Sequence, residues 1–413
     1  MKYKYIIFFL ILLLNKSVLL GTEIEINNKI NIFAYNFNRI SNNLHKIDDY
    51  LAINDINTNI SDDNFAFFAA HLNDSKSEND EVYANENGWG IDLKYPPEDY
   101  VPFEQFTYAD DPRYTFDGDP PLLKSHINYW NAAAVFASYS AIFYVQHSMQ
   151  QSTIWKDVGT FQIQEDIQYA LWVDKFGHFY GGYSTGYLLS EMLQLSGFSW
   201  ESATWLGGAL GFGYQTYIEV LDGMSEGWGF SPSDFYADIA GSAFFVAQYY
   251  FPILQNFTPK FTYVNPPWLG EKKRAEAEIF IDNYSSQIFW MSINVRNLFG
   301  GAIKEYCPDW LNLAVGYAAY SLAGWDWVNE RYRYPADISH PVNPDVAGNR
   351  KFIVALDYNL VKLLPDGPPF WNWLKQSLNL FKLPSPALEI GFEGKTKFYL
   401  IYPFEFRFSG FRF

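Results

Sequence analysis

Three short stretches of the sequence each place two ionisable side chains within otherwise apolar surroundings. The two members of each pair stand three or four residues apart, which brings both onto one face of a helix. The pairs are Asp174 and His178, Glu219 and Asp222, and Asp234 and Asp238. Because an unpaired charge is costly in apolar surroundings, we expect these side chains to meet one another or a ligand.

One imidazole among several carboxylates suits a hard or borderline divalent ion such as Mg²⁺, Mn²⁺ or Zn²⁺. All six side chains are therefore candidate metal ligands. An ion held there would activate water for attack on a lipid-linked or cell-wall substrate. In this catalytic hypothesis the acting residues are Asp174, His178 and Glu219, and His178 would equally serve as a general base oriented by Asp174.

A structural alternative makes the same side chains a buried hydrogen-bond network without chemistry. The cluster has a lone histidine and lacks the doubled Glu-x-x-His pattern of di-iron bundles. A catalytic His-Glu-x-x-His motif is also absent from the sequence. Of the two hypotheses, the structural one is our first prediction.

Four apolar segments between residues 125 and 258 would position these pairs. They are residues 129–155, 167–195, 200–221 and 233–255. Gly197 is suited to end the second segment and Ser199 to cap the third. Asp222-Gly223 would end the third, and Ser231-Pro232 would begin the fourth. Because the connections are short, we predict a four-helix bundle.

After residue 260 the helical periodicity changes to alternation. Strands are predicted within residues 278–296 and at 311–320, 351–360, 387–392 and 397–413. The last stretch places six residues on one face: Phe398, Leu400, Tyr402, Phe404, Phe406 and Phe408. Alternation with aromatic residues is typical of outer-membrane strands, so we expect an antiparallel, barrel-like or membrane-associated β-region. The alternative is a sheet that only packs on the helices, and the predicted fold class is α+β in either case.

Composition limits the classes of partner. The 413-residue chain has 29 Lys+Arg against 46 Asp+Glu, a formal net charge of −17. This balance argues against nucleic acid and against a basic patch for anionic lipid. No phosphate-cradling Gly-Lys-Ser loop is present, so we expect no nucleotide. Aromatic residues make up 20% of the chain, as suits a membrane–water interface, and we expect the outer membrane or an envelope lipid as the partner.

The first residues have the pattern of a secretory signal peptide. Lys2 and Lys4 precede an apolar run at residues 6–14, and we predict a signal at residues 1–21. A polar, partly disordered arm and a proline-rich lead-in are predicted at 22–124, followed by the helical domain at 125–258 and the β-region at 259–413. The single cysteine, Cys307, excludes an internal disulfide and a cysteine-based metal cluster, and leaves no cysteine after the signal to carry a lipid.

The order of the ionisable residues also carries a resemblance over about residues 125–250. The shared elements are Asp174-Lys175-x-x-His178-Phe179, Glu219-x-x-Asp222 and Ser233-Asp234-x-x-x-Asp238-x-x-Gly241. They resemble the YfiM-like family of predicted periplasmic lipoproteins, a domain of unknown function, and more distantly the VanZ-like proteins, a helical membrane family tied to glycopeptide-antibiotic tolerance. Two departures are the missing lipidated cysteine and Asp238, near which the VanZ-like pattern usually has Asn. The resemblance implies a helical fold and an envelope address, and it implies no reaction.

We therefore expect an exported protein of the outer membrane or periplasm of a Gram-negative bacterium, without an assignable reaction. The alternative is a metal-assisted hydrolase centred on the acidic cluster. A third hypothesis is a binding or transport module in which the helices plug a barrel lumen.

Overall fold

The computed structural model describes residues 93–264, 283–322 and 349–404, apart from residues 103, 104, 110, 153, 300, 321 and 393, together with four two-residue strands. All described residues lie within one compact unit, Tyr83–Phe413. The predicted signal peptide and most of the predicted arm lie outside the described residues. The domain boundaries stay predictions.

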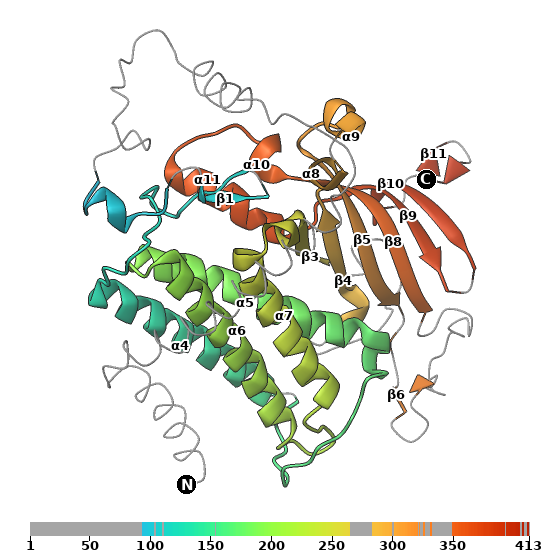
Figure 1. Cartoon of the computed structure of the whole chain (residues 1–413). Helices are drawn as coiled ribbons and strands as arrows, with labels where there is room; N and C mark the ends of the chain where they lie inside the picture. The colour runs from blue at the N-terminus through green and yellow to red at the C-terminus, as the bar shows by residue number, and fades with distance from the viewer. Residues whose placement is uncertain are drawn as a thin grey trace, which may run out of the picture. The chain divides into compact units, whose positions relative to one another are not determined.

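Four long helices follow one another in the chain, as predicted (Figure 1). They are α4 (Tyr129–Gln151), α5 (Val173–Leu195), α6 (Trp200–Asp222) and α7 (Pro232–Tyr250). The predicted caps are confirmed: the side chains of Ser199 and Ser231 accept hydrogen bonds from backbone N–H groups in the first turns of α6 and α7. Gly197, with φ +85°, follows the end of α5. The second helix begins later than predicted, because the 3-10 helix η3 (Tyr169–Trp172) precedes it.

Glycines let the three central helices approach closely. A Cβ atom on Gly211 of α6 would lie 2.7 Å from the carbonyl oxygen of Gly182 in α5. A Cβ on Gly241 of α7 would lie 1.9 Å from the carbonyl oxygen of Phe179. Real side chains do not reach such distances, so backbone contacts backbone at these positions.

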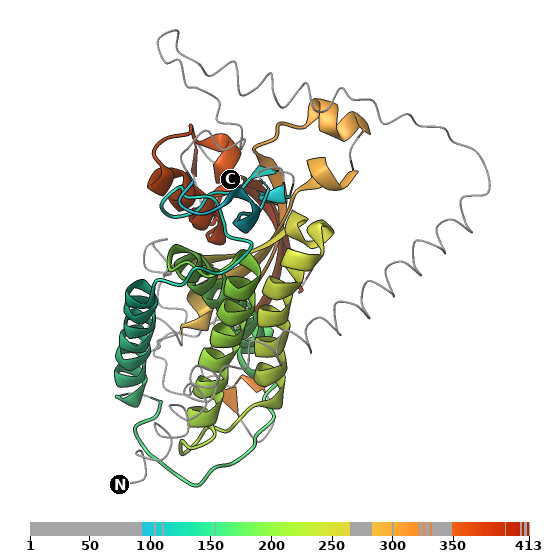
Figure 2. The ribbon, with the colours of Figure 1, turned by 60° about the vertical axis from the view of Figure 1, so that its left-hand side comes forward.

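Helix α4 lies beside α6 and is the most exposed of the four (Figure 2). Its Phe143 ring contacts the rings of Tyr214 and Tyr217 in α6. Its outward side chains are largely bare: Trp130 is 86% exposed and Ile142 is 66% exposed. Within the described part of the chain, no helix combines the length and apolarity that crossing a membrane requires.

The β-region contains one antiparallel sheet of six strands in the order β10-β9-β8-β5-β4-β3, which confirms the α+β class. The strands are β3 (Phe257–Tyr263), β4 (Gln287–Ile293), β5 (Leu311–Tyr320), β8 (Asn349–Tyr358), β9 (Ser385–Gly391) and β10 (Thr396–Tyr402). Strand β3 was not predicted. Among the described strands the sheet is open, with β3 and β10 at its two edges.

The prediction of one continuous strand over 397–413 is wrong. Phe398 and Leu400 share a face as expected, but the register shifts between Tyr399 and Tyr402, and Tyr402 is buried. Pro403 follows, and proline has no N–H with which to extend the ladder. Phe406 lies outside the described residues.

The sheet is strongly curled. The ring of Trp290 in β4 lies 5.8 Å from the ring of Tyr402 at the end of β10. Three strands separate β4 from β10, so a flat sheet would hold them about 19 Å apart. The concave face encloses a core that includes Ile353 and Tyr399. The opposite face meets α5, where Tyr180 contacts Phe261 and Phe289.

Short elements complete the described chain. They are η1 (Pro97–Asp99), β1 (Thr107–Tyr108), β2 (Asp111–Pro112), η4 (Pro252–Asn256), η6 (Tyr284–Ser286), α8 (Val295–Phe299), α9 (Gly301–Tyr306), β6 (Trp325–Asp326), β7 (Arg331–Tyr332), α10 (Leu360–Leu363), α11 (Pro369–Ser377), η7 (Leu378–Leu380), β11 (Arg407–Phe408) and β12 (Phe411–Arg412).

Candidate functional site

A cavity of about 260 Å³ lies where the three central helices meet the sheet. Five of the six predicted site residues line it: Asp174, His178, Glu219, Asp222 and Asp234. The sixth, Asp238, lies behind the imidazole of His178. Since one water takes up about 30 Å³, the cavity has room for a small ligand together with ordered water.

Asp238 holds the imidazole of His178 in place. The Nδ1 atom of His178 lies 2.9 Å from Oδ1 of Asp238, whose side chain is fully buried. The other ring nitrogen, Nε2, faces two carboxylates, at 3.6 Å from Oδ1 of Asp174 and 3.5 Å from Oε1 of Glu219. Both distances exceed a normal hydrogen bond. The imidazole is therefore oriented by Asp238 on one side and lies within ion-pair distance of two carboxylates on the other. Burial alone would lower the pKa of His178, but Asp234 and Asp238 outweigh it and raise that pKa well above its ordinary value.

Lys175 neutralises part of the acidic cluster. Its Nζ atom lies 3.0 Å from the carboxylate of Asp174, 3.1 Å from that of Asp234 and 2.5 Å from that of Asp166. The hydroxyl of Ser231 also donates to Asp166, and its backbone N–H donates to Glu219 at 2.9 Å. The start of α7 is thereby connected to both α5 and α6.

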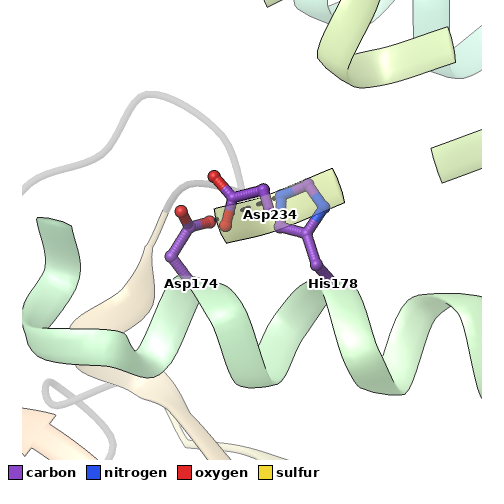
Figure 3. Close-up of side chains that lie close together, drawn as sticks. All are labelled: Asp174, His178 and Asp234. Atoms are coloured by element: carbon purple, nitrogen blue, oxygen red, sulfur yellow. Dashed lines mark ion pairs between the residues drawn. The ribbon is translucent and has the colours of Figure 1, made fainter. Parts of the chain in front are cut away.

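Three side chains from two helices converge on one point. Figure 3 shows Asp174 and His178 from α5 and Asp234 from α7 directed toward one another. One potential ligand atom from each lies within 4.8 Å of the others. Oδ1 of Asp234 and Oδ2 of Asp238 are buried and make no hydrogen bond to any described residue, although the Asp234 carboxylate pairs with Lys175.

Burial and neighbouring charges shift the pKa values of these groups in opposite directions. Burial raises the pKa of Glu219 to about 8, with Asp222 adding to the rise and His178 opposing it. Burial alone would raise the pKa of Asp174 too, but Lys175 and His178 outweigh it and lower that pKa to about 2. Burial also raises the pKa of Asp238. The raised pKa values mean that Glu219 and Asp238 hold protons more readily than usual, and a bound cation would compete with those protons.

The segment that leads into α5 is strained. Ala170, Leu171 and Trp172 have φ values of 46°, 51° and 79°, which are left-handed conformations that cost about 1–3 kcal/mol each for residues other than glycine. The hydroxyl of Tyr317 in the sheet donates to the Leu171 carbonyl at 2.6 Å, and Arg350 lies over the Trp172 ring. The sheet thus holds the turn that delivers Asp174 to the cavity.

Sequence reasoning missed several residues of the site. Asp166 stands in a polar loop and Tyr284 is far away in the chain, yet the Tyr284 hydroxyl donates to Asp174 Oδ1 at 2.6 Å. No spacing pattern points to either residue. Ser184, which lines the cavity, belongs to a Gly-x-Ser-x-Gly sequence at residues 182–186. That sequence lies inside α5, and a nucleophile elbow requires a strand-to-helix turn.

Comparison with known proteins gives one family match. Residues 159–250 match a family model described as a predicted periplasmic lipoprotein (DUF2279). The matched segment is 92 residues of a chain of 413, and it contains Asp166 together with all six predicted site residues. No curated protein and no solved structure matches the chain.

The match confirms the domain-of-unknown-function part of the resemblance. It supports an exported protein of the periplasm or cell envelope. The YfiM-like and VanZ-like assignments stay predictions, as does the outer membrane as the specific location.

Proposed function

We propose that the helical domain binds a divalent metal ion and uses it to hydrolyse a lipid-linked or cell-wall substrate in the cell envelope. The observation that carries the proposal is the placement of the His178 Nε2 atom 3.6 and 3.5 Å from two carboxylates, close to the spacing of two ligands of one ion. The proposed ligands are Asp174, His178 and Asp234, with Glu219 beside them.

Coordination geometry supports this assignment. Nitrogen and oxygen ligands stand about 2.0–2.2 Å from zinc or magnesium, so two ligands of one ion stand about 3.0 Å apart in an octahedron and about 3.4 Å apart in a tetrahedron. The distances from His178 Nε2 to Asp174 and Glu219 are 3.6 and 3.5 Å. Only a small movement separates this arrangement from a coordination shell.

The partner of the other ring nitrogen supports it too. Histidine ligands of metals commonly donate their second N–H to a carboxylate, which fixes the ring and raises its basicity. Asp238 occupies that place, at 2.9 Å from Nδ1. Tyr284 and Lys175 hold the Asp174 carboxylate in the same manner, through its two oxygen atoms.

The proposed residues have separate roles. A bound divalent ion would supply Lewis acidity and lower the pKa of a water molecule. Glu219 stands beside His178, and its second oxygen is fixed by the backbone N–H of Ser231. The charge of a bound ion would favour its ionised form, which is the form that a proton acceptor requires. Asp222 also lines the cavity, but the indole N–H of Trp155 binds it at 2.5 Å, and we assign it no ligand role.

The cavity and the strand pattern support the substrate class and the address. Phe261 and Phe289 from the sheet provide an apolar wall opposite the polar cluster, as suits a substrate with both kinds of surface. We place the protein at the outer membrane rather than free in the periplasm, on the strength of the exposed aromatic and aliphatic side chains of the β-region.

Metal analysis of the purified protein tests the proposal. Wild type, His178→Ala and Asp234→Asn would be dialysed against Zn²⁺, Mn²⁺ or Mg²⁺ and their metal content measured. His126→Ala is the matched control, because His126 pairs with Asp99 away from the cavity. We expect close to one ion per chain in wild type and control, and little in the two folded site variants.

A positive result would be followed by assays of ester and phosphoester hydrolysis with the loaded protein. Absence of metal from wild type, with both site variants unfolding at lower temperature, would refute the proposal. The cluster would then be the buried structural network of the alternative hypothesis.

A further inference from the structure

The face of the sheet that meets α5 is only partly covered. On strands β3, β4 and β5 this face carries Phe261, Phe289 and Tyr317, which pack against α5 and η3. On strands β8, β9 and β10 no described segment covers the same face. Its exposed side chains there form what we call the outer patch: Phe352, Leu356, Leu388, Ile390, Phe398 and Leu400.

Strand register makes the outer patch continuous. Phe352 pairs with Ile390, and Leu388 stands between Val354 on one neighbouring strand and Phe398 on the other. The six side chains are each between 36% and 51% exposed. None of them is charged or polar, and a contiguous exposed surface of this kind marks an interaction site.

The polarity of the outward face indicates the partner. The concave face buries the apolar and aromatic core around Ile353 and Tyr399 together with the charged Lys351 and Glu389, whereas the outward face carries the outer patch. An antiparallel sheet with one face in water has polar side chains on that face. The apolar outward face of β8, β9 and β10 departs from this pattern and has the character of strands that face lipid.

Strand length and charge define the kind of contact. A strand that crosses a bilayer needs about 9–11 residues. Strands β9 and β10 have seven each, and β8 has ten, of which the patch occupies only the stretch from Phe352 to Leu356. The patch therefore reaches the hydrocarbon of one leaflet. The formal net charge of −17 opposes anionic headgroups, so apolar contact with neutral lipid must provide the affinity.

We propose that the outer patch inserts into a leaflet of neutral lipid and holds the protein on the membrane. The inference rests on the envelope address of the proposed function and does not depend on its metal. The covered half of the same sheet face, at Phe261 and Phe289, lines the cavity. Docking through the bare half would bring the cavity beside the membrane, where a lipid-linked substrate is found.

Vesicle flotation with the purified full chain tests the proposal. The vesicles would contain phosphatidylcholine and phosphatidylethanolamine, in low and high salt. We expect wild type to float in both, and Phe398→Asp to lower the partition coefficient at least about tenfold, because burying one phenylalanine contributes about 1.5–3 kcal/mol. Ile142→Asp is the matched control, since it makes the same kind of change on the exposed face of α4.

A spin label gives a reading that does not rely on a charged substitution. Cys307 is the single cysteine, so Cys307→Ser provides a background for Leu400→Cys or Ile142→Cys with a nitroxide attached. We expect the label at position 400 to become accessible to oxygen and protected from a water-soluble nickel reagent when vesicles are added. The label at position 142 should not change.

Three results would overturn the inference. The first is that wild type does not float with the vesicles. The second is that Phe398→Asp and Ile142→Asp lower the partition coefficient equally. The third is that wild type does not float but forms a dimer, which Phe398→Asp dissociates. The last would assign the patch to a second copy of the chain. Metal content measured on the same samples separates the two proposals, because flotation without metal would refute only the proposed function.

Discussion

The close contact between α5 and α6 leads to a prediction with an internal control. Gly211 and Gly213 stand two residues apart in α6, but their surroundings differ. A Cβ on Gly211 would lie 2.7 Å from the Gly182 carbonyl oxygen and 2.9 Å from the Gly186 nitrogen, whereas a Cβ on Gly213 would have no atom within 4 Å. Replacing each with alanine isolates the effect of the contact.

The expected magnitude follows from these distances. Alanine has a higher helix propensity than glycine, which adds about 0.5–1 kcal/mol to the free energy of unfolding of each variant. Because this gain is the same for both, it cancels when the two variants are compared. Ordinary contact begins at 3.4 Å, and the atoms facing Gly211 are backbone that cannot rotate away. The two helices must therefore separate by about 0.7 Å, and such overpacking costs about 1–3 kcal/mol. We expect Gly211→Ala to be less stable than Gly213→Ala by that amount, and Gly213→Ala to be slightly more stable than wild type.

Urea unfolding followed by far-ultraviolet circular dichroism measures this difference. Metal affinity gives a second reading, because Gly211 and Glu219 lie along the same face of α6 and Gly182 and His178 along the facing side of α5. Only Gly211→Ala should weaken metal binding. Equal stability of the two alanine variants, with equal dependence on urea, would show that backbone contact at Gly211 does not limit the approach of the helices.

Three further predictions concern other parts of the described chain. Glu191→Gln should destabilise by about 3–5 kcal/mol, measured by urea unfolding against the exposed control Glu226→Gln, because it leaves the buried guanidinium of Arg113 without its ion-pair partner. Ser231→Ala should cost about 0.5–2 kcal/mol through loss of the cap of α7, and Ser231→Asn should recover part of that loss. Burial, opposed by Asp357 and reinforced by Lys260, lowers the pKa of Lys382 to about 8 from 10.5. The unfolded chain then binds this proton more tightly than the folded protein does, so the free energy of unfolding should rise as pH increases between those two values, and Lys382→Met should flatten the rise.

Helix boundaries were predictable from the sequence because local chemistry sets them. Ser199 and Ser231 cap their helices through hydrogen bonds that span two or three residues, and Gly197 adopts the positive φ that its type permits. The start of α5 was misplaced, since the left-handed turn at Ala170–Trp172 is held by contacts with Tyr317 and Arg350 of the sheet. Long-range contacts of this kind leave no local signal.

The same distinction applies to the site. Helical spacing brought Asp174 and His178 to one face, and the requirement that buried charges be paired predicted that the three helices share a cluster. Neither argument could show that Nδ1 of His178 faces Asp238 while Nε2 faces Glu219. That arrangement depends on how closely the helices approach one another at their glycines. Tyr284 was equally beyond reach, since it approaches Asp174 across a separation of 110 residues.

Alternation in the β-region predicted strands but could not show which face is buried. A sequence with apolar residues at every second position reads the same whether those residues face a core or lipid. Register and curl decide the matter. They bury Glu389 on the concave side, where the hydroxyls of Tyr320 and Tyr402 donate to it, and they leave the outer patch exposed.

The division of one sheet face between cavity and outer patch connects the two proposals. The family match ends at residue 250, before the first strand of the sheet, so the matched segment holds the carboxylates and the histidine but not Tyr284 or the apolar wall at Phe261 and Phe289. In this chain the sheet therefore adds two things to the helices. It fixes Asp174 and the turn before it, and it extends the apolar wall of the cavity into a surface suited to lipid. A helical domain with the cluster alone would keep the proposed metal ligands and lose the feature on which the proposal of a lipid-linked substrate rests.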